Sequence, residues 1–162
     1  MTRSLGNKAL KRLERAARAL VTQFQRRSGR GSQSEQPLVL AVTHCHPIRV
    51  VLYAAAFQGG WRFHFTKSLR AALDVASTRR PKAVFYDHAA GDPAWCQYCL
   101  CLSREGIPFV SVAHKNDDSI FFGVLAAGGY QACGEPLTSE EIVNVVDFAQ
   151  EVAGLAHVPV KS

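Results

Sequence analysis

Five short apolar segments that alternate with helix-like segments constrain the fold of this chain more than any other feature. The expected strands cover residues 38–42, 61–66, 83–86, 109–113 and 131–133, and the expected helices cover 47–58, 69–80, 95–104, 119–127 and a final segment from 138. Pro47 suits a first helical turn, Ser68 suits an N-cap, and Thr138 with Glu141 forms a capping box. Apolar strands joined by helices indicate a parallel sheet covered on both faces. We therefore expect an α/β protein with a flavodoxin-like (βα)5 doubly wound sheet of order 2-1-3-4-5.

The first 37 residues differ from the rest in charge. The net charge is +6, and nine of the 19 Lys and Arg residues lie within residues 1–37, beside two Glu. Apolar residues recur there at helical spacing: Leu10, Leu13, Ala17, Leu20 and Phe24. This pattern predicts a basic amphipathic helix over residues 7–27, followed by a flexible linker rich in Ser and Gly. We expect two units, a basic arm with its linker over residues 1–37 and a domain over 38–155.

Three interpretations of the basic arm stay open. Its apolar stripe can form a homodimer or pack on its own domain. A basic amphipathic helix can also lie on an anionic membrane, or contact nucleic acid through its charge. No apolar run approaches the roughly 20 residues of a membrane span, and the N-terminus lacks the apolar core of a signal peptide. The five cysteines lie in apolar runs or at a strand end, which favours reduced thiols and a cytoplasmic location.

Polar side chains come directly after the expected strands, at the edge where such folds carry their functional crevice. Six of them could hold a transition metal such as Zn²⁺: His44, His46, Asp87, His88, His114 and Glu135. The alternative is that these histidines are ordinary polar residues of exposed turns. Cys96, Cys99 and Cys101 lack the second pair that a zinc site needs, so we expect Cys96 and Cys99 to face the core.

The turn after the first expected strand disfavours several enzyme classes. Residues 43–46 read Thr-His-Cys-His, without the G-x-G-x-x-G of a dinucleotide site or the phosphate loop of a flavodoxin. No nucleophile and base stand together elsewhere. We expect no catalytic residues, and we place an N-cap at Asp118 or Ser119 in the polar turn before residue 120.

The segment from residue 127 to 141 resembles the C-terminal signature of response-regulator receiver domains, together with Asp87 at a strand end. The residues that carry this resemblance are Ala127-Gly128, Pro136 and Glu140-Glu141, and it extends over about residues 38–152. It implies that Asp87 is the phosphoacceptor. Thr43 and His44 then stand in place of the acidic pair that holds Mg²⁺. Three further departures are Ala113 for a Ser or Thr, Ala132 for an aromatic residue, and Glu135 for a lysine.

These departures imply a degenerate, pseudo-receiver module, since phosphoryl transfer needs cations around the developing charge. Glu135 would add repulsion to a phosphorylated Asp87. The resemblance implies a histidine kinase or effector as partner in a two-component phosphorelay, and a contact face on the fourth helix, fifth strand and fifth helix, with Ile120, Phe121 and Phe122. No cofactor is expected. The alternatives are an atypical receiver phosphorylated at Asp87 with Mg²⁺, and a small metal-binding α/β protein.

Overall fold

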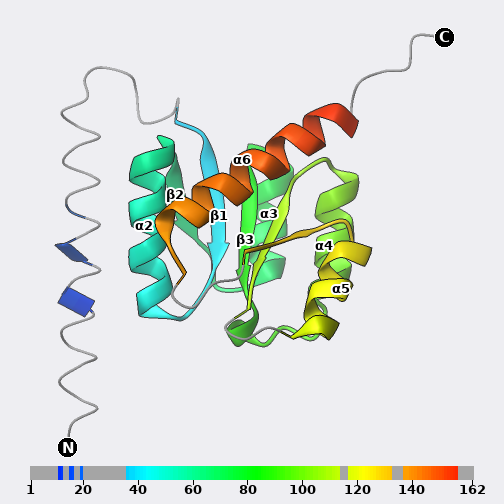
Figure 1. The fold of residues 1–162 in the computed structure, drawn as a ribbon, viewed down its shortest axis with the longest axis horizontal. Coiled ribbons are helices and arrows are strands. Elements are labelled where there is room, and N and C mark those ends of the chain that lie inside the picture. Colours follow the sequence, from blue (N-terminus) through cyan, green and yellow to red (C-terminus); the bar gives the residue numbers. More distant parts are fainter. Residues whose placement is uncertain are drawn as a thin grey trace, which may run out of the picture.

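One parallel sheet of five strands forms the centre of the domain (Figure 1). The computed structural model describes residues 11–12, 15–16, 19, 36–113, 117–132 and 137–156, and for residues 131, 132 and 156 the backbone alone. The strands are β1 (Leu38–Val42), β2 (Arg62–Phe65), β3 (Ala83–Asp87), β4 (Phe109–Val112) and β5 (Tyr130–Ala132). Their order is β2-β1-β3-β4-β5, which confirms the expected doubly wound topology.

The helices begin and end close to where the local signals place them. They are α2 (His46–Gly59), α3 (Leu69–Arg79), the 3-10 turn η1 (His88–Ala90), α4 (Trp95–Arg104), α5 (Asp118–Ala126) and α6 (Ser139–Ala156). The Ser68 hydroxyl accepts a hydrogen bond from the Ala71 N–H at 3.2 Å and caps α3. The Glu141 N–H donates to the Thr138 hydroxyl at 3.2 Å, which is one half of the expected capping box.

Successive residues of β1 point to opposite faces of the sheet and divide the core in two. One layer packs against α3, α4 and the end of α5, and contains Leu40, Tyr86, Leu102 and Phe109 among others. The other layer packs against α2 and α6, and contains Val39, Leu52, Phe85, Ile142 and Val146 among others. Both faces of the sheet are covered, as expected from a central strand such as β1 that is apolar at every position. The carboxyl ends of the strands therefore remain as the edge where polar groups can gather.

Most boundaries agree with the expected ones to within a residue, and two differences concern named calls. The N-cap of α5 is Asp117, whose carboxylate accepts from the N–H groups of Ser119 (2.9 Å) and Ile120 (3.4 Å), so the prediction of Asp118 or Ser119 is wrong. A run of polar residues offers several cap candidates, and the register of the following helix decides among them. Strand β5 begins at Tyr130 rather than at residue 131, and its expected last residue, Cys133, lies outside the described residues.

The described residues of the basic arm, 11–12, 15–16 and 19, are helical and exposed, in agreement with the expected helix there. The rest of that helix, the linker and the apolar stripe lie outside the described residues. No helix in the described part of the chain is long and apolar enough to cross a membrane.

Candidate functional site

The sheet register brings the ends of the central strands into one row. Val42 pairs with Tyr86 between β1 and β3, so Thr43 follows β1 beside Asp87 at the end of β3. Asp87 pairs in turn with Val112 of β4, and Val112 with Ala132 of β5. The row lies at the lower edge of the sheet in Figure 1. The expected juxtaposition of strand ends is therefore present for the first, third, fourth and fifth strands.

Asp87 is a buried acceptor at the centre of this row. The residue is only 1% exposed. The Thr43 hydroxyl donates to its Oδ2 at 2.8 Å, and the Ala89 N–H donates to its Oδ1 at 2.9 Å. The second bond makes Asp87 the N-cap of η1. Both carboxylate oxygens thus have protein donors, as the burial of a charged group requires.

Thr43 connects this carboxylate to the first turn of α2. Its hydroxyl oxygen accepts from the Cys45 N–H at 3.0 Å while its proton goes to Asp87. Its carbonyl oxygen accepts from Nε (3.3 Å) and Nη2 (3.0 Å) of Arg49, whose guanidinium lies over the Phe65 ring at 4.9 Å from the ring centre. Sequence reasoning did not find Arg49, because no spacing rule relates a helical arginine to a strand-end carbonyl.

His88 lies between two aromatic rings beside the row. Its ring meets Tyr86 edge-on at 5.0 Å and Trp95 at 4.8 Å. Burial lowers the pKa of His88, and the charges of Asp87 and Asp117 oppose that effect. Its Nε2 is buried and has no hydrogen-bond partner among the described residues. A neutral imidazole suits this environment, since a protonated ring would bury a positive charge.

The proposed metal ligands are only partly placed by the structure. His44 is exposed and His46 is half-buried, while His114 and Glu135 lie outside the described residues. Within the described part of the chain, no three His, Cys, Asp or Glu side chains gather as a metal site requires. Asp87 already accepts hydrogen bonds through both oxygens. The metal site stays a prediction that depends on His114 and Glu135.

Several solved structures that match this architecture are response-regulator receiver domains. The signal receiver domain of a modulated diguanylate cyclase from Desulfovibrio desulfuricans G20 matches with a TM-score of 0.64 and 14% identity, over 76% of this chain and 100% of that one. The chemotaxis response regulator CheY4 of Vibrio cholerae matches with a TM-score of 0.59 and 15% identity, over 70% and 98%. The signal receiver domain of an HD domain-containing protein from Pseudomonas fluorescens Pf-5 matches at 0.63 and 13%, over 79% and 95%.

The chain has the receiver fold. No family model and no curated protein sequence matches it, so the likeness rests on three-dimensional structure. At identities of this order the likeness establishes the fold and leaves the chemistry of the site to the residues themselves.

The structure describes two further positions that the resemblance to receivers singles out. Ala113, expected in place of a Ser or Thr, is 6% exposed directly after β4. Ala132 lies in β5, in register with Val112. Glu135, expected in place of a lysine, lies outside the described residues. The described end of the row therefore offers Asp87 a threonine hydroxyl and a backbone amide.

One of the three cysteines of α4 belongs to the core. Cys99 is fully buried in the core, and burial raises the pKa of its thiol to about 12. Its Sγ lies 3.5 Å from the Ala127 carbonyl oxygen. Cys96 is half-buried and Cys101 is exposed. The prediction that Cys99 faces the core is confirmed, and Cys96 is only partly buried.

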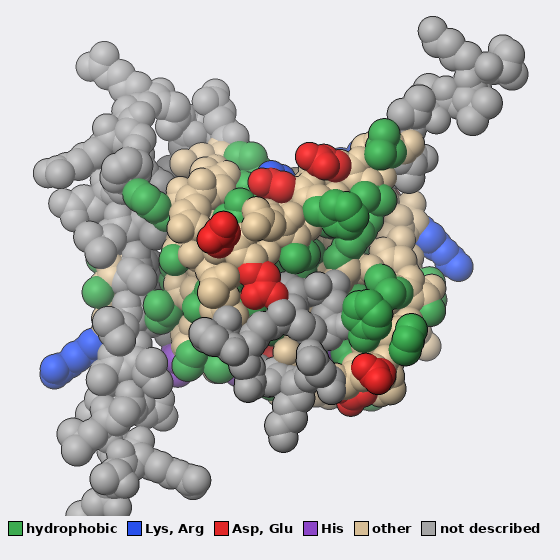
Figure 2. Space-filling view, viewed as in Figure 1, with side chains coloured by type: hydrophobic (Ala, Val, Ile, Leu, Met, Phe, Trp, Pro, Cys, Tyr) green, Lys and Arg blue, Asp and Glu red, His purple; other side chains and the backbone are tan. Residues whose placement is uncertain are grey.

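The receiver fold exposes a group of apolar side chains on α5 and α6. We call this the α5–α6 face, and its exposed members are Phe121, Phe122, Leu125, Phe148 and Leu155. Green hydrophobic side chains gather over these two helices in Figure 2. Tyr130 of β5 contacts the Phe148 ring of α6 edge-on, with 6.0 Å between the ring centres. Ile120 is only half-buried, whereas Phe122 is 65% exposed.

Proposed function

We propose that this chain is a receiver-type signalling module that works by protein–protein contact, without a phosphoryl group on Asp87. The main support for this proposal is the environment of Asp87. The residue is 1% exposed, and both oxygens of its carboxylate accept hydrogen bonds. An attacking carboxylate oxygen must first lose such a partner and reach solvent. In this fold the change would break either the Thr43 bond at Oδ2 or the Ala89 bond at Oδ1 that caps η1.

The electrostatics of the row support the same proposal. Phosphoryl transfer to a carboxylate depends on a metal ion and on positive side chains that neutralise the developing charge. Thr43 and His44 occupy the positions that receivers give to the acidic pair. Thr43 instead directs its hydroxyl proton to Asp87 at 2.8 Å. The site therefore fixes the position of the Asp87 carboxylate and does not favour its phosphorylation.

The α5–α6 face is the proposed contact surface. Phe122 (65% exposed) and Phe148 (58% exposed) leave large aromatic surfaces in water, and aromatic residues of this kind are enriched at protein interfaces. The partner class proposed from the fold is a signalling protein, either a histidine kinase or an effector. The basic arm is proposed as a second surface, used for self-association or docking, with an anionic membrane or nucleic acid as alternatives.

One specific observation favours a second candidate, an atypical receiver phosphorylated at Asp87. The aspartate stands at the end of β3, in the row where the fold carries its crevice. A rearrangement of η1 that releases the Ala89 N–H would expose its Oδ1.

Amide NMR spectra recorded with Mg²⁺ and beryllofluoride separate the two candidates, since this anion adds to a receptive carboxylate as a phosphoryl mimic. The proposal predicts no change in the amide signals of Ala89 and its neighbours up to millimolar beryllofluoride. A receiver that retains the acidic pair and the lysine serves as the positive control. Saturable shifts in this chain that disappear in an Asp87→Asn variant would establish the second candidate.

A further inference from the structure

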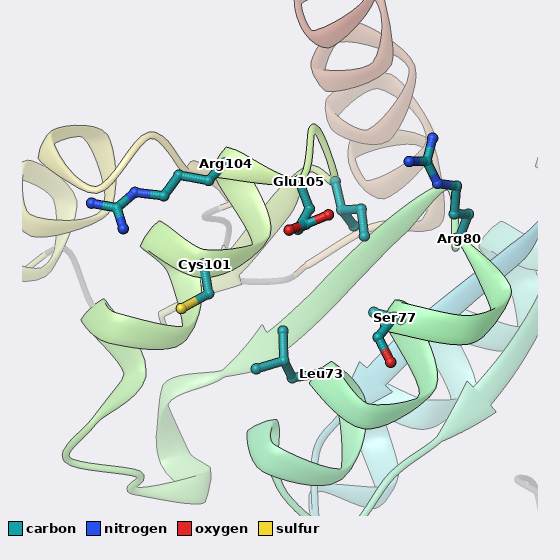
Figure 3. Close-up of a pocket in the computed structure, with 8 residues that line it drawn as sticks. Leu73, Ser77, Arg80, Cys101, Arg104 and Glu105 are labelled. Carbon is teal, nitrogen blue, oxygen red and sulfur yellow. The ribbon is translucent and has the colours of Figure 1, made fainter.

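A groove between α3 and α4 lies at the opposite edge of the sheet from Asp87. It has a volume of about 430 Å³ and is formed by the C-terminal halves of both helices and the segment before β4 (Figure 3). Volumes of roughly 300–1,000 Å³ are typical of ligand sites. This groove belongs neither to the strand-end row nor to the α5–α6 face.

The floor of the groove is apolar and its rim is charged. Leu73 and Ala76 of α3 and Ile107 before β4 form the floor. Arg80 after α3 and Arg104 at the end of α4 stand on opposite sides of the rim, and Figure 3 shows their guanidinium groups directed outward, away from the middle of the groove. All eight lining residues are described, and the rim carries two arginines against one acidic residue, Glu105.

These rim charges are exposed and have no ion-pair partners in the described part of the chain. The two ion pairs found there join Arg70 to Asp74 and Lys82 to Asp147. Arg80 and Arg104 are therefore available for an external anion. Figure 3 shows Glu105 between the two arginines, so an anionic group is favoured at the flanks of the groove and disfavoured at its middle.

The backbone of Arg80 supports a role for its side chain. Arg80 is the C-cap of α3 with φ 41°, the one non-glycine residue with positive φ among the described residues. The four other described positions of this kind are Gly60, Gly91, Gly106 and Gly128. Glycine relieves the steric conflict that a side chain meets in this conformation, and the following Pro81 restricts Arg80 further. Arg80 therefore places its side chain at the rim from a backbone conformation in which glycine would be less strained.

We propose that this groove binds an acidic peptide segment of a partner protein, with one apolar side chain on the floor and flanking carboxylates at Arg80 and Arg104. Charge complementarity selects this occupant. The basic arm of the chain itself carries the same sign as the rim arginines and is disfavoured there. Arginine holds carboxylates through paired N–H donors, which gives the flanking contacts direction as well as charge.

The probe is a fluorescein-labelled peptide, Asp-Glu-Asp-Leu-Asp-Glu-Asp, titrated with the full chain by fluorescence anisotropy. Two comparison peptides replace all its acids by Lys, or its Leu by Ser. We expect the acidic probe to bind, the Lys peptide not to bind, and the Ser peptide to bind more weakly. Arg80→Gly and Arg104→Ala should each weaken binding about tenfold, as the loss of one charge-assisted contact implies.

Two controls distinguish binding in the groove from general electrostatic attraction of the probe to the protein. Arg79→Ala removes the neighbouring charge of α3, which does not line the groove, and should leave the dissociation constant within about twofold. Arg80→Gly should also raise the melting temperature, because it relieves the strained backbone, so lost binding cannot reflect lost folding. Absence of binding to the wild type overturns the proposal. The proposal is also overturned if Arg79→Ala and Arg80→Gly change the dissociation constant equally. It is overturned as well if both groove variants still bind the probe through the basic arm.

Discussion

The hydroxyl of Thr43 donates a hydrogen bond of 2.8 Å to Oδ2 of Asp87 across 44 residues of sequence, and both side chains are buried. This bond joins the ends of β1 and β3 at the position that the resemblance to receivers assigns to the phosphoacceptor. The Ala89 N–H holds the other oxygen at 2.9 Å. The aspartate thus serves as a capping and strand-joining residue in this structure.

Thr43→Val keeps the shape of the side chain and removes the hydroxyl. We expect the free energy of unfolding to fall by about 1–3 kcal/mol, because Oδ2 of a buried carboxylate loses its donor. Urea denaturation measures the change. Thr66→Val is the matched control, since the Thr66 hydroxyl makes a longer bond of 3.3 Å to the Ser68 carbonyl. A loss for Thr43→Val no larger than that of the control would contradict the capping role.

The stability of the domain should fall on mild acidification because of His88. Burial lowers its pKa below the usual 6.5, so the unfolded chain binds the proton more readily than the folded one. The free energy of unfolding is therefore highest above pH 6.5 and declines as the pH falls from there towards the folded pKa. Urea denaturation at pH 7.5 and 5.5 should show a smaller decline in His88→Phe than in the wild type. Equal declines would mean that other groups carry the effect.

Asp117 should matter more to α5 than its neighbour Asp118. Its carboxylate accepts from the Ser119 side chain and from two backbone N–H groups, and these bonds lower its pKa. Asp117→Ala should lower the free energy of unfolding measurably, as the loss of an N-cap does. Asp118→Ala leaves the cap in place and should cost about 0.3 kcal/mol through the helix dipole. The reverse ranking in denaturant titrations would restore Asp118 as the cap.

The α5–α6 face should be where a protein partner touches the domain. A photoreactive benzoylphenylalanine at position 122 should form adducts in a cell extract, while the same group at position 57 should not. Phe57 is the matched control because it is 49% exposed but lies on α2. A Phe148→Ser change in the protein labelled at position 122 should reduce the adduct yield several-fold. Equal labelling from both positions would show that the apolar exposure of α5 has no special role.

The fold could be predicted from local signals because each signal acts over a few residues. The run from Leu38 to Val42 is apolar at every position and is buried at every position, which indicates a central parallel strand. Gly60, with φ 66°, ends α2 where the sequence predicts a stop. The cap of α5 could not be chosen in advance, since adjacent polar residues satisfy the same local rule.

The candidate site was predictable in its position but not in its bonding. The topology places Thr43 and Asp87 at one edge, and the register confirms it. Which group donates to which depends on side-chain distances between strands, which no sequence pattern contains. The same holds for Arg49, whose contact with the Thr43 carbonyl depends on how α2 lies over the sheet, and for the groove between α3 and α4.

Intact mass after incubation with acetyl phosphate and Mg²⁺, beside an Asp87→Ala variant, tests the central claim most directly. A receiver that retains the acidic pair and the lysine confirms that the reagent is active. We predict that wild-type protein and variant keep the same unmodified mass, because the Asp87 carboxylate is 1% exposed and bonded to Thr43 and Ala89. A phosphoryl adduct on the wild type that is missing from Asp87→Ala would contradict the account and make this chain a working phosphoacceptor.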